Sequence, residues 1–273
     1  MFDLIDRALS EDIGTADLTT TAVVPVGARA RARIEQKSPG VPAGLRVAER
    51  VFERVDPDLR WHGHASEVEW RDGGLLAEVA GEAASILAAE RVALNFLGRL
   101  SGIATLTARY VRAVDGTGVR ILDTRKTTPG LRALEKEAVR SGGGLSHRTG
   151  LFDAILVKEN HATLAGGVGQ AARRALAAAP AGVTVEVECA TLDEVAAALE
   201  AGVPRLLLDN MSAAELREAV ELAGERAELE ASGGITLETI RAVAETGVDF
   251  ISVGALTHSA PALDVSLLLE RLR

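Results

Sequence analysis

The chain has 273 residues, of which 47% are hydrophobic and 25% are charged, a composition that excludes an intrinsically disordered or collagen-like protein. Its net charge of −9 argues against binding of nucleic acid or anionic lipid over the whole surface. The single cysteine, Cys189, excludes an internal disulfide bond and a zinc site built on cysteine pairs.

The amino-terminal stretch MFDLIDRALSEDIG carries acids where a secretory signal has a basic stretch and then an apolar core. No uncharged apolar run approaches the roughly 18 residues of a membrane span. We therefore expect a cytoplasmic protein that has no membrane partner and no nucleic-acid partner.

The first hundred residues predict strands followed by a long helix. The stretches ARARIEQ and WHGHASEVEWRDGGLLAEVAG alternate apolar and polar residues like antiparallel strands, and Asp72-Gly73-Gly74 is a turn signal. The stretch GEAASILAAERVALNFLGRLSG then has the pattern of a helix. We predict a separate α/β domain over residues 1–102.

From about residue 119 onward, short aliphatic runs alternate with helical stretches. Runs such as VTVEVEC and RLLLDN are separated by stretches such as TLDEVAAALEAG, which opens on a Thr and closes on a Gly. Glu188, Asp209, Ser232 and Gly254 recur at intervals of 21 to 23 residues, the spacing of minimal strand–helix units. About six such units are recognisable.

This alternation is typical of either a doubly wound sheet or a closed barrel. Every predicted strand ends in a polar residue or a glycine, and a barrel brings all such ends to one mouth, whereas an open sheet spreads them along a line. We predict an incomplete α/β barrel over residues 103–262. We hypothesise that the tail, residues 263–273, packs on the first domain.

Two neighbouring glycine turns predict a phosphate site. Ser232-Gly233-Gly234 and, one unit later, Val253-Gly254-Ala255 place bare backbone N–H groups at strand-to-helix turns, where a helix amino terminus favours an anion. Pairs of such turns bind phosphate in barrel proteins. A purely steric role of the glycines is the alternative.

Two carboxylates predict a metal site on the same rim. Glu188 and Asp209 end neighbouring strands, and Mg²⁺ is commonly bound by one or two carboxylates together with ligand phosphates. The alternatives are an acid and base pair, or salt bridges with Lys158 or Arg125.

A basic stretch interrupts the acidic chain between residues 123 and 148, where six basic residues stand against three acidic ones. A cationic island in an acidic protein favours a small polyanionic ligand over a polymer. Arg132, Lys136 and Arg140 are spaced by four residues, so a solvated helix face accounts for them. It does not account for the flanking cations, which are Arg125, Lys126, His147 and Arg148.

Several long motifs resemble the quinolinate phosphoribosyltransferase family. They include ALSEDIGTADLTT, AERVALNFLGRLSGIAT, ILDTRKTTPGLRALEKEAVRSGGGLSHRTGLFDAILVKENH, VEVECATLDEV, LLLDNMS, LEASGGI and VDFISVGALTHS. The resemblance covers almost the whole chain in the family's order. It implies an N-terminal α/β sandwich joined to an incomplete α/β barrel, and a homodimer in which the partner subunit completes each barrel mouth.

The implied reaction transfers phosphoribosyl from phosphoribosyl pyrophosphate to quinolinate and releases CO₂ and pyrophosphate, giving nicotinate mononucleotide for NAD biosynthesis. The resemblance implies quinolinate binding by cationic side chains, one of them, Arg91, supplied by the neighbouring subunit. It implies Mg²⁺ as the cofactor. The implied residues are Arg91, Arg125, His147, Arg148 and Lys158 for quinolinate; Thr124 and Lys126 for quinolinate or the diphosphate; Glu188 and Asp209 for Mg²⁺; and Ser232, Gly233, Gly234 and Gly254 for the 5′-phosphate.

Two other functions remain open from the sequence. One is a transferase of the same architecture that uses another acceptor, such as nicotinate. The other is a catalytically silent barrel that binds a sugar phosphate as a sensor. A monocarboxylate needs fewer cations than the five found here, and a sensor needs no pair of metal carboxylates, so both features favour the quinolinate enzyme.

Overall fold

The computed structural model describes residues 2–272, which divide into two compact units. To the first unit belong Met1–Ala108, Thr128–Gly143 and Ser259–Arg273, and to the second belong Arg109–Thr127 and Gly144–His258. Each unit therefore combines segments that are distant in sequence, whereas the division expected from the sequence assigns residues 103–262 to the barrel as one stretch. No helix within residues 2–272 has both the length and the apolar character that a membrane crossing requires.

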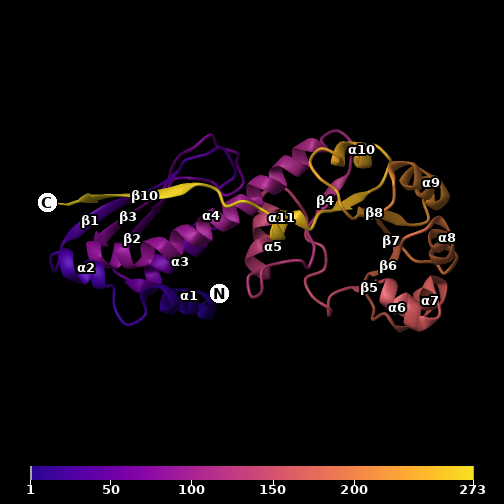
Figure 1. Cartoon of the computed structure of the whole chain (residues 1–273), viewed down its shortest axis with the longest axis horizontal. Helices are drawn as coiled ribbons and strands as arrows, with labels where there is room; N and C mark the ends of the chain where they lie inside the picture. The colour runs from indigo at the N-terminus through magenta and orange to yellow at the C-terminus, as the bar shows by residue number, and fades with distance from the viewer. Residues whose placement is uncertain (1, 273) are drawn as a thin grey trace. The chain divides into compact units, whose positions relative to one another are not determined.

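The first unit contains a four-stranded antiparallel sheet in the order β10-β1-β3-β2 (Figure 1). In β1 small apolar residues alternate with arginines, so that Ala30, Ala32 and Ile34 form a fully buried face. The elements of this unit are α1 (Phe2–Ile13), α2 (Leu18–Val23), β1 (Arg29–Gln36), α3 (Leu45–Val55), β2 (Arg60–Gly63), β3 (Gly74–Glu82), α4 (Ala83–Ala113, whose last residues belong to the second unit), α5 (Arg132–Ser141) and β10 (Val265–Arg271).

The antiparallel pairing of β2 with β3 confirms the strands predicted from alternation. The connection differs from the prediction, because residues 64–73 form a loop before β3 begins at Gly74. The helix predicted over the following stretch is also longer than its motif, since α4 continues to Ala113.

Two glycines on α4 allow the carboxyl-terminal segment to cross the helix closely. The amide of Leu263 donates to the carbonyl oxygen of Gly98 at 2.9 Å. A Cβ atom at Gly102 would lie 2.0 Å from the carbonyl oxygen of Pro261. Any side chain at position 102 would therefore push this segment away from the helix.

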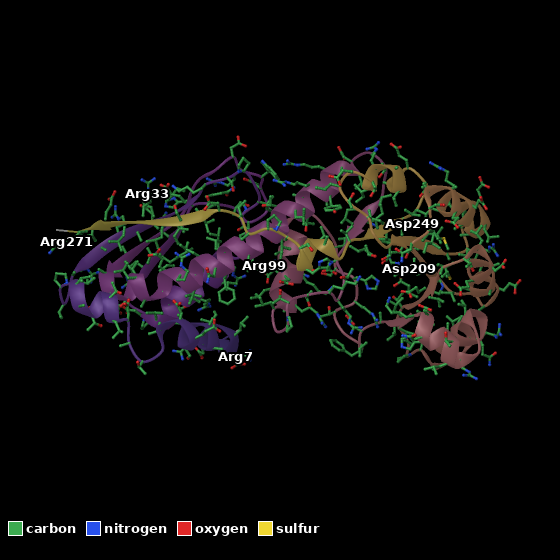
Figure 2. The ribbon with its side chains drawn as sticks, viewed as in Figure 1. Arg7, Arg33, Arg99, Asp209, Asp249 and Arg271 are labelled. Carbon is green, nitrogen blue, oxygen red and sulfur yellow. The ribbon has the colours of Figure 1, made fainter. Side chains whose placement is uncertain are left out.

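Helix α5 presents only part of the solvated cationic face that its spacing suggested, since Arg140 is exposed but Lys136 is not. Lys136 and Glu135 are almost fully buried, with 2% and 0% of their surface exposed. Glu135 accepts hydrogen bonds from Arg99 at 2.8 Å and from the amide of Thr128 at 3.0 Å, so this charge is paired (Arg99 is labelled in Figure 2). The prediction of a solvated face is therefore wrong for Lys136.

The second unit contains a six-stranded parallel sheet in the order β4-β9-β8-β7-β6-β5, with helices α7, α8 and α9 outside its curve (Figure 1). Its elements are β4 (Arg120–Leu122), β5 (Ile155–Val157), α6 (Glu159–Ala165), α7 (Val168–Ala178), β6 (Val185–Cys189), α8 (Leu192–Glu200), β7 (Arg205–Asp209), α9 (Ala213–Ala223), β8 (Glu228–Ser232), α10 (Ile240–Ala244), β9 (Phe250–Ser252) and α11 (Ala255–His258).

The barrel is interrupted between its first two predicted units. β4 pairs with β9, the last strand of this sheet in chain order. β4 and β5 lie at the two ends of the sheet and do not pair with each other. Between them, Leu145 makes a single parallel bridge to Leu122. The incomplete α/β barrel predicted from the sequence is confirmed, and residues 143–150 pass through the gap as an irregular segment.

Candidate active site

Ten of the thirteen predicted site residues lie at the carboxyl ends of the parallel strands, and two more, His147 and Arg148, lie in the gap segment. Because all strands of this sheet run in parallel, these ends lie at one edge. The thirteenth residue, Arg91, is an exposed residue of α4 in the first unit. The twelve are Thr124, Arg125 and Lys126 after β4; His147 and Arg148 in the gap; Lys158 after β5; Glu188 in β6; Asp209 in β7; Ser232, Gly233 and Gly234 at β8; and Gly254 after β9.

The two carboxylates predicted to bind metal have different environments. Glu188 forms an ion pair with Lys158 and accepts from the amide of Glu159 at 3.3 Å. Asp209, labelled in Figure 2, accepts from the side-chain amide of Asn210 at 2.7 Å. The salt bridge between Glu188 and Lys158 that the sequence left open is therefore present.

Asn210 has an unusual backbone that shapes the end of β7. Its φ is 56°, in the left-handed region, which a residue other than glycine adopts at a cost of roughly 1–3 kcal/mol. Its amide donates to the carbonyl oxygen of Ser232 at 2.9 Å, and its side chain holds Asp209. This strained residue therefore ties two neighbouring strand ends together.

The glycine turn after β8 is required by its backbone and by its neighbours. Gly233 has φ 101° and Gly234 has φ 60°, and a Cβ atom at Gly233 would lie 2.2 Å from the side-chain oxygen of Asn210. Helix α10 begins only at Ile240, so the helix amino terminus expected directly after this turn is absent there. An anion at this strand end would therefore contact backbone N–H groups of a turn and not those of a helix.

The turn after β9 lies next to the end of β4. A Cβ atom at Gly254 would lie 3.1 Å from the Lys126 side chain, and the hydroxyl of Thr257 donates to the Lys126 carbonyl oxygen at 2.8 Å. The amide of Lys126 in turn donates to the hydroxyl of Thr124 at 3.1 Å. The Lys126 side chain and a glycine turn are thus brought together, an arrangement suited to a phosphate.

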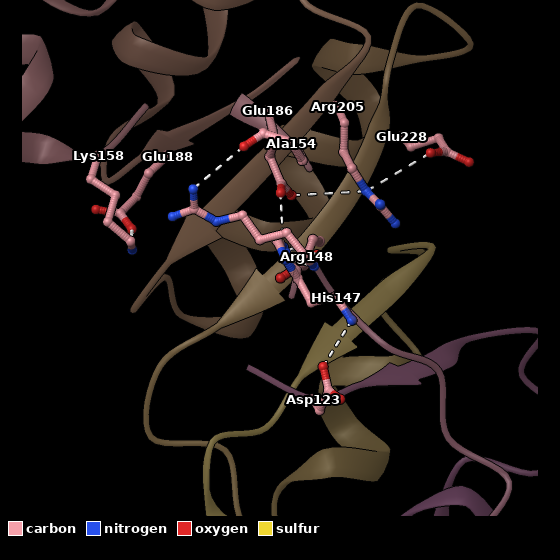
Figure 3. A network of polar contacts seen from close by, with 10 residues as sticks. Asp123, His147, Arg148, Ala154, Lys158, Glu186, Glu188, Arg205 and Glu228 are labelled. Carbon is pink, nitrogen blue, oxygen red and sulfur yellow. Dashed lines mark hydrogen bonds and ion pairs between the residues drawn. The ribbon is translucent and has the colours of Figure 1, made fainter. Parts of the chain in front are cut away.

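Two guanidinium groups influence each other at the gap in the barrel. Partial burial, and after it the positive charge of Arg125, lower the pKa of Arg148. Arg148 also donates to the carbonyl oxygen of Ala154 at 3.5 Å (Figure 3). Two like charges in this position repel each other, and an anion that contacts both would relieve the repulsion.

A buried cluster inside the barrel was not predicted. The His147 ring Nε2 lies 2.9 Å from Glu186 of β6 (Figure 3). The same atom lies 3.5 Å from Glu230 of β8. The three side chains offer ligand atoms within 4.8 Å of one another, a spacing that could hold a metal ion. Burial, and then the negative charge of Glu186, raise the pKa of Glu230 to about 7.

The protonation of His147 is set by opposing effects. Burial disfavours the charged ring, but the hydrogen bond to Glu186 and the charge of Glu230 outweigh burial and raise the pKa of His147. The ring Nδ1 accepts from the amide of Arg148 at 2.7 Å. Since an amide can only donate, this contact leaves the ring proton of the neutral form on Nε2, facing Glu186.

Sequence reasoning missed Glu186 and Glu230 although a signal was present. Each stands two residues before a predicted site residue of the same strand, Glu188 or Ser232, and alternate residues of a strand share a face. Both are therefore charges on the inner face of a barrel. Only the strand register shows that they converge on one histidine.

An interrupted α/β barrel with cations and glycine turns at its strand ends belongs to the class of α/β-barrel proteins, in which the loops after the last strands frequently bind phosphate groups. The family model described as quinolinate phosphoribosyl transferase, C-terminal domain, matches residues 103–268, and the model of the N-terminal domain matches residues 17–101. The chain belongs to the quinolinate phosphoribosyltransferase family.

Individual relatives agree with this assignment. The probable nicotinate-nucleotide pyrophosphorylase (carboxylating) of Bacillus subtilis is 42% identical over 265 residues, which cover 97% of this chain and 91% of that protein. The crystal structure of NadC from Streptococcus pyogenes has a TM-score of 0.95 at 41% identity and covers 100% of this chain and 97% of that one. The nicotinate-nucleotide pyrophosphorylase of Francisella tularensis has a TM-score of 0.94 at 39% identity, with 98% and 95% coverage.

Proposed function

We propose that the chain transfers the phosphoribosyl group of phosphoribosyl pyrophosphate to quinolinate, with release of CO₂ and pyrophosphate, to give nicotinate mononucleotide. Relatives about 42% identical bear the names carboxylating nicotinate-nucleotide pyrophosphorylase and decarboxylating quinolinate phosphoribosyltransferase. The observation that carries the proposal is the placement of two guanidinium groups at the interruption of the barrel, Arg125 directly after β4 and Arg148 in the segment that bridges to β4. Quinolinate is a dianion, and its two carboxylates fit such a pair of guanidinium groups.

Quinolinate binding is assigned to the cations around the gap. Arg125, Arg148 and Lys158 supply charge, with His147 beside them, and Thr124 lies at the end of the same strand as Arg125. Arg can bind a carboxylate through two parallel hydrogen bonds, which fixes the orientation of the pyridine ring. Lys158 pairs with Glu188 in this structure and would exchange that partner for substrate.

Phosphoribosyl pyrophosphate is assigned to the neighbouring strand ends. The turns at Gly233, Gly234 and Gly254, with Ser232, supply N–H and hydroxyl donors for the 5′-phosphate. Glu188 and Asp209 are partly exposed oxygen donors on adjacent strands, a donor set that fits Mg²⁺. Mg²⁺ held there would neutralise charge on the pyrophosphate.

The reaction then needs orientation and charge stabilisation more than a reactive side chain. The bond from ribose C1 to pyrophosphate breaks, the electron pair leaves with pyrophosphate, and the pyridine nitrogen attacks C1 from the opposite face. Lys126 stabilises the departing charge. The bond to the adjacent carboxylate then breaks, CO₂ leaves, and a proton replaces it on a carbon stabilised by the positive nitrogen.

The structure contains no thiol suited to covalent catalysis among its described residues. Burial raises the pKa of Cys189 to about 12, so the thiol stays protonated near neutral pH. This agrees with a mechanism in which no side chain acts as a nucleophile.

We also propose a homodimer in which Arg91 of each subunit serves the barrel of the other. Arg91 lies on α4 and is exposed, outside all strand ends that carry the remaining cations. A third carboxylate-binding arginine supplied in this way would complete the set of five cations.

We further propose that the protein is cytoplasmic, on the basis of its composition and its net charge of −9. Some plant relatives are named as mitochondrial or chloroplastic proteins. Cell fractionation with an antibody against the chain would test this placement.

The decisive assay incubates the protein with carboxyl-labelled quinolinate, phosphoribosyl pyrophosphate and Mg²⁺. We expect CO₂ and nicotinate mononucleotide in equal amounts, loss of both when EDTA removes Mg²⁺, and recovery with excess Mg²⁺. Product formation from nicotinate but not quinolinate would identify the other acceptor class. Tight binding of phosphoribosyl pyrophosphate without any turnover would favour the sensor.

A further inference from the structure

We propose that Glu186 and Glu230 are positioning residues of the quinolinate pocket, which hold the His147 ring from inside the barrel and, through it, the backbone that presents Arg148. This inference rests on the proposed function and adds two residues to its site. Neither carboxylate is at the mouth where substrate enters, since both are at least 97% buried.

The segment they hold is irregular and needs anchors. Residues 143–150 contain no helix and no strand longer than the single bridge at Leu145. The backbone amide of His147 donates to Asp123 at 2.8 Å, which fixes the segment to the end of β4. The ring Nε2 donates to Glu186 at 2.9 Å, and Nδ1 accepts from the amide of Arg148 at 2.7 Å (Figure 3). His147 thus connects the acid pair to the backbone of Arg148.

The direction of Nε2 depends on the two acids. Because Nδ1 accepts from the amide of Arg148, the ring has its donor on the opposite side, where Glu186 accepts it and the Glu230 carboxylate lies 3.5 Å away. Neutral amides in their place would keep the volume but weaken this attraction. The ring would then lose the contact that sets its angle, and Arg148 would lose its fixed backbone.

Both acids stand at positions where stability alone would favour apolar side chains. Glu186 and Glu230 alternate with buried residues of the strands VEVEC and ELEAS. Neither carboxylate oxygen of Glu230 has a hydrogen bond of good geometry among the described residues, and its polar neighbours are Glu186, His147, Arg205 and the Ser252 hydroxyl. Buried carboxylates with so few partners destabilise a fold, so their benefit lies in what they hold.

A metal ion is the competing occupant of this cluster, since three ligand atoms lie within 4.8 Å. The charges argue against it. The guanidinium Nε of Arg205 lies 3.8 Å from Glu186, and the imidazole N–H already points between the two carboxylates. A divalent ion would have to displace that proton and sit near a fixed positive charge.

The test compares Glu230→Gln and Glu186→Gln with Glu228→Gln. Glu228 is the matched control, because it is a half-exposed glutamate of the same strand as Glu230 and the substitution removes the same charge. It also lies 3.8 Å from Arg205, so it controls for the loss of a carboxylate beside that guanidinium. Steady-state kinetics should show about a tenfold rise in the KM for quinolinate in each of the first two variants. The KM for phosphoribosyl pyrophosphate should stay within about twofold, and the control should match the unmodified enzyme in both.

A second measurement separates positioning from loss of stability. If Glu230 acts through His147 and Arg148, Glu230→Gln should add little to the quinolinate KM of Arg148→Ala, whereas independent effects would multiply. Equal rises in both KM values, multiplication in the double variant, or no difference from Glu228→Gln would overturn the inference. The inference would also be overturned if the unmodified protein contained stoichiometric Zn²⁺ or Mn²⁺ and Glu230→Gln had lost that ion. Absence of turnover by the unmodified protein would instead contradict the proposed function.

Discussion

Arg148 is the residue for which the proposed quinolinate site makes the sharpest prediction. Replacement by alanine removes one charged hydrogen-bonding group, which contributes roughly 1.5–3 kcal/mol. We expect the KM for quinolinate to rise about ten- to a hundredfold, with the KM for phosphoribosyl pyrophosphate nearly unchanged. Steady-state kinetics with each substrate varied in turn would measure this.

The matched control is Arg217→Ala, since Arg217 is an exposed arginine of α9 that donates to a backbone carbonyl of its own helix. It should alter neither KM. An unchanged quinolinate KM in folded Arg148→Ala would remove Arg148 from the pocket.

The raised pKa of Glu230 predicts a pH-dependent stability. The folded state binds this proton more tightly than the unfolded state, whose carboxyl has its ordinary pKa of 4.5, so the stabilisation is complete below pH 4.5 and is lost as pH rises through about 7. Glu230→Gln removes the titration. Relative to this variant, the wild type should lose on the order of 1–3 kcal/mol of unfolding free energy between pH 5 and pH 8.

Urea unfolding followed by circular dichroism at both pH values would measure the difference. Glu228→Gln again serves as the control for removal of a glutamate from β8. A difference between wild type and Glu230→Gln that is the same at pH 5 and pH 8 would contradict the pKa assigned to Glu230.

Among the elements, the turn after β8 should lose its ability to bind phosphate when a single methyl group is added to it. Gly233→Ala places a Cβ atom against Asn210 at a positive φ, so the turn must move and its N–H groups lose their direction. The KM for phosphoribosyl pyrophosphate should rise about ten- to a hundredfold if one or two charged hydrogen bonds are lost. Binding measured by calorimetry should fall in parallel.

Gly202→Ala is a matched comparison in the turn before β7. Gly202 also has a positive φ of 82°, but no atom lies within 4 Å of its Cβ position. This variant should cost about 1–2 kcal/mol of stability and leave both KM values unchanged. Equal effects of the two substitutions on substrate binding would show that the turn after β8 has no special role.

The strands and helices of the barrel were predictable where local signals agree. β6 and β7 coincide with aliphatic runs, and α8 and α9 begin after Thr191 and Ser212, whose side chains accept from the amides of Glu194 and Glu215. The start of α10 was not predictable, because Thr236 has the sequence of a cap but lies in a turn that precedes the helix.

What the sequence could not reveal depends on contacts between distant segments. Lys136 has the spacing of an exposed helix face, yet α5 packs within the first unit, and the sequence contains no local mark of that burial. Alternation shows that Glu186 and Glu188 share a face, but their convergence with Glu230 on His147 follows only from the strand order. The strand-end residues were identified in advance, and their individual roles stay predictions.

For the whole molecule, the proposed homodimer makes a quantitative prediction. Arg91→Ala and Lys158→Ala should each be inactive, because each spoils every site of its own dimer. When the two proteins are mixed and exchange subunits, half of the dimers are mixed, and each has one intact site of two. About a quarter of wild-type activity should therefore return, as measured by CO₂ release.

Exchange itself must be shown, for example by mass spectrometry of differently labelled subunits. A mixture of Arg91→Ala with itself is the control and should stay inactive. Failure to regain activity despite complete exchange would mean that Arg91 acts in its own subunit or has no part in the site.

The pairing of β10 with β1 has a consequence for how the nascent chain folds. β10 follows the whole barrel in sequence, yet it completes the sheet of the first unit by pairing along β1 from Ala30 to Gln36. During translation β1 therefore emerges first, and one of its edges stays unpaired until the ribosome has made every barrel strand and then β10. The first unit is therefore completed only after the second unit has been made. This is the reverse of the usual order, in which the amino-terminal domain folds first.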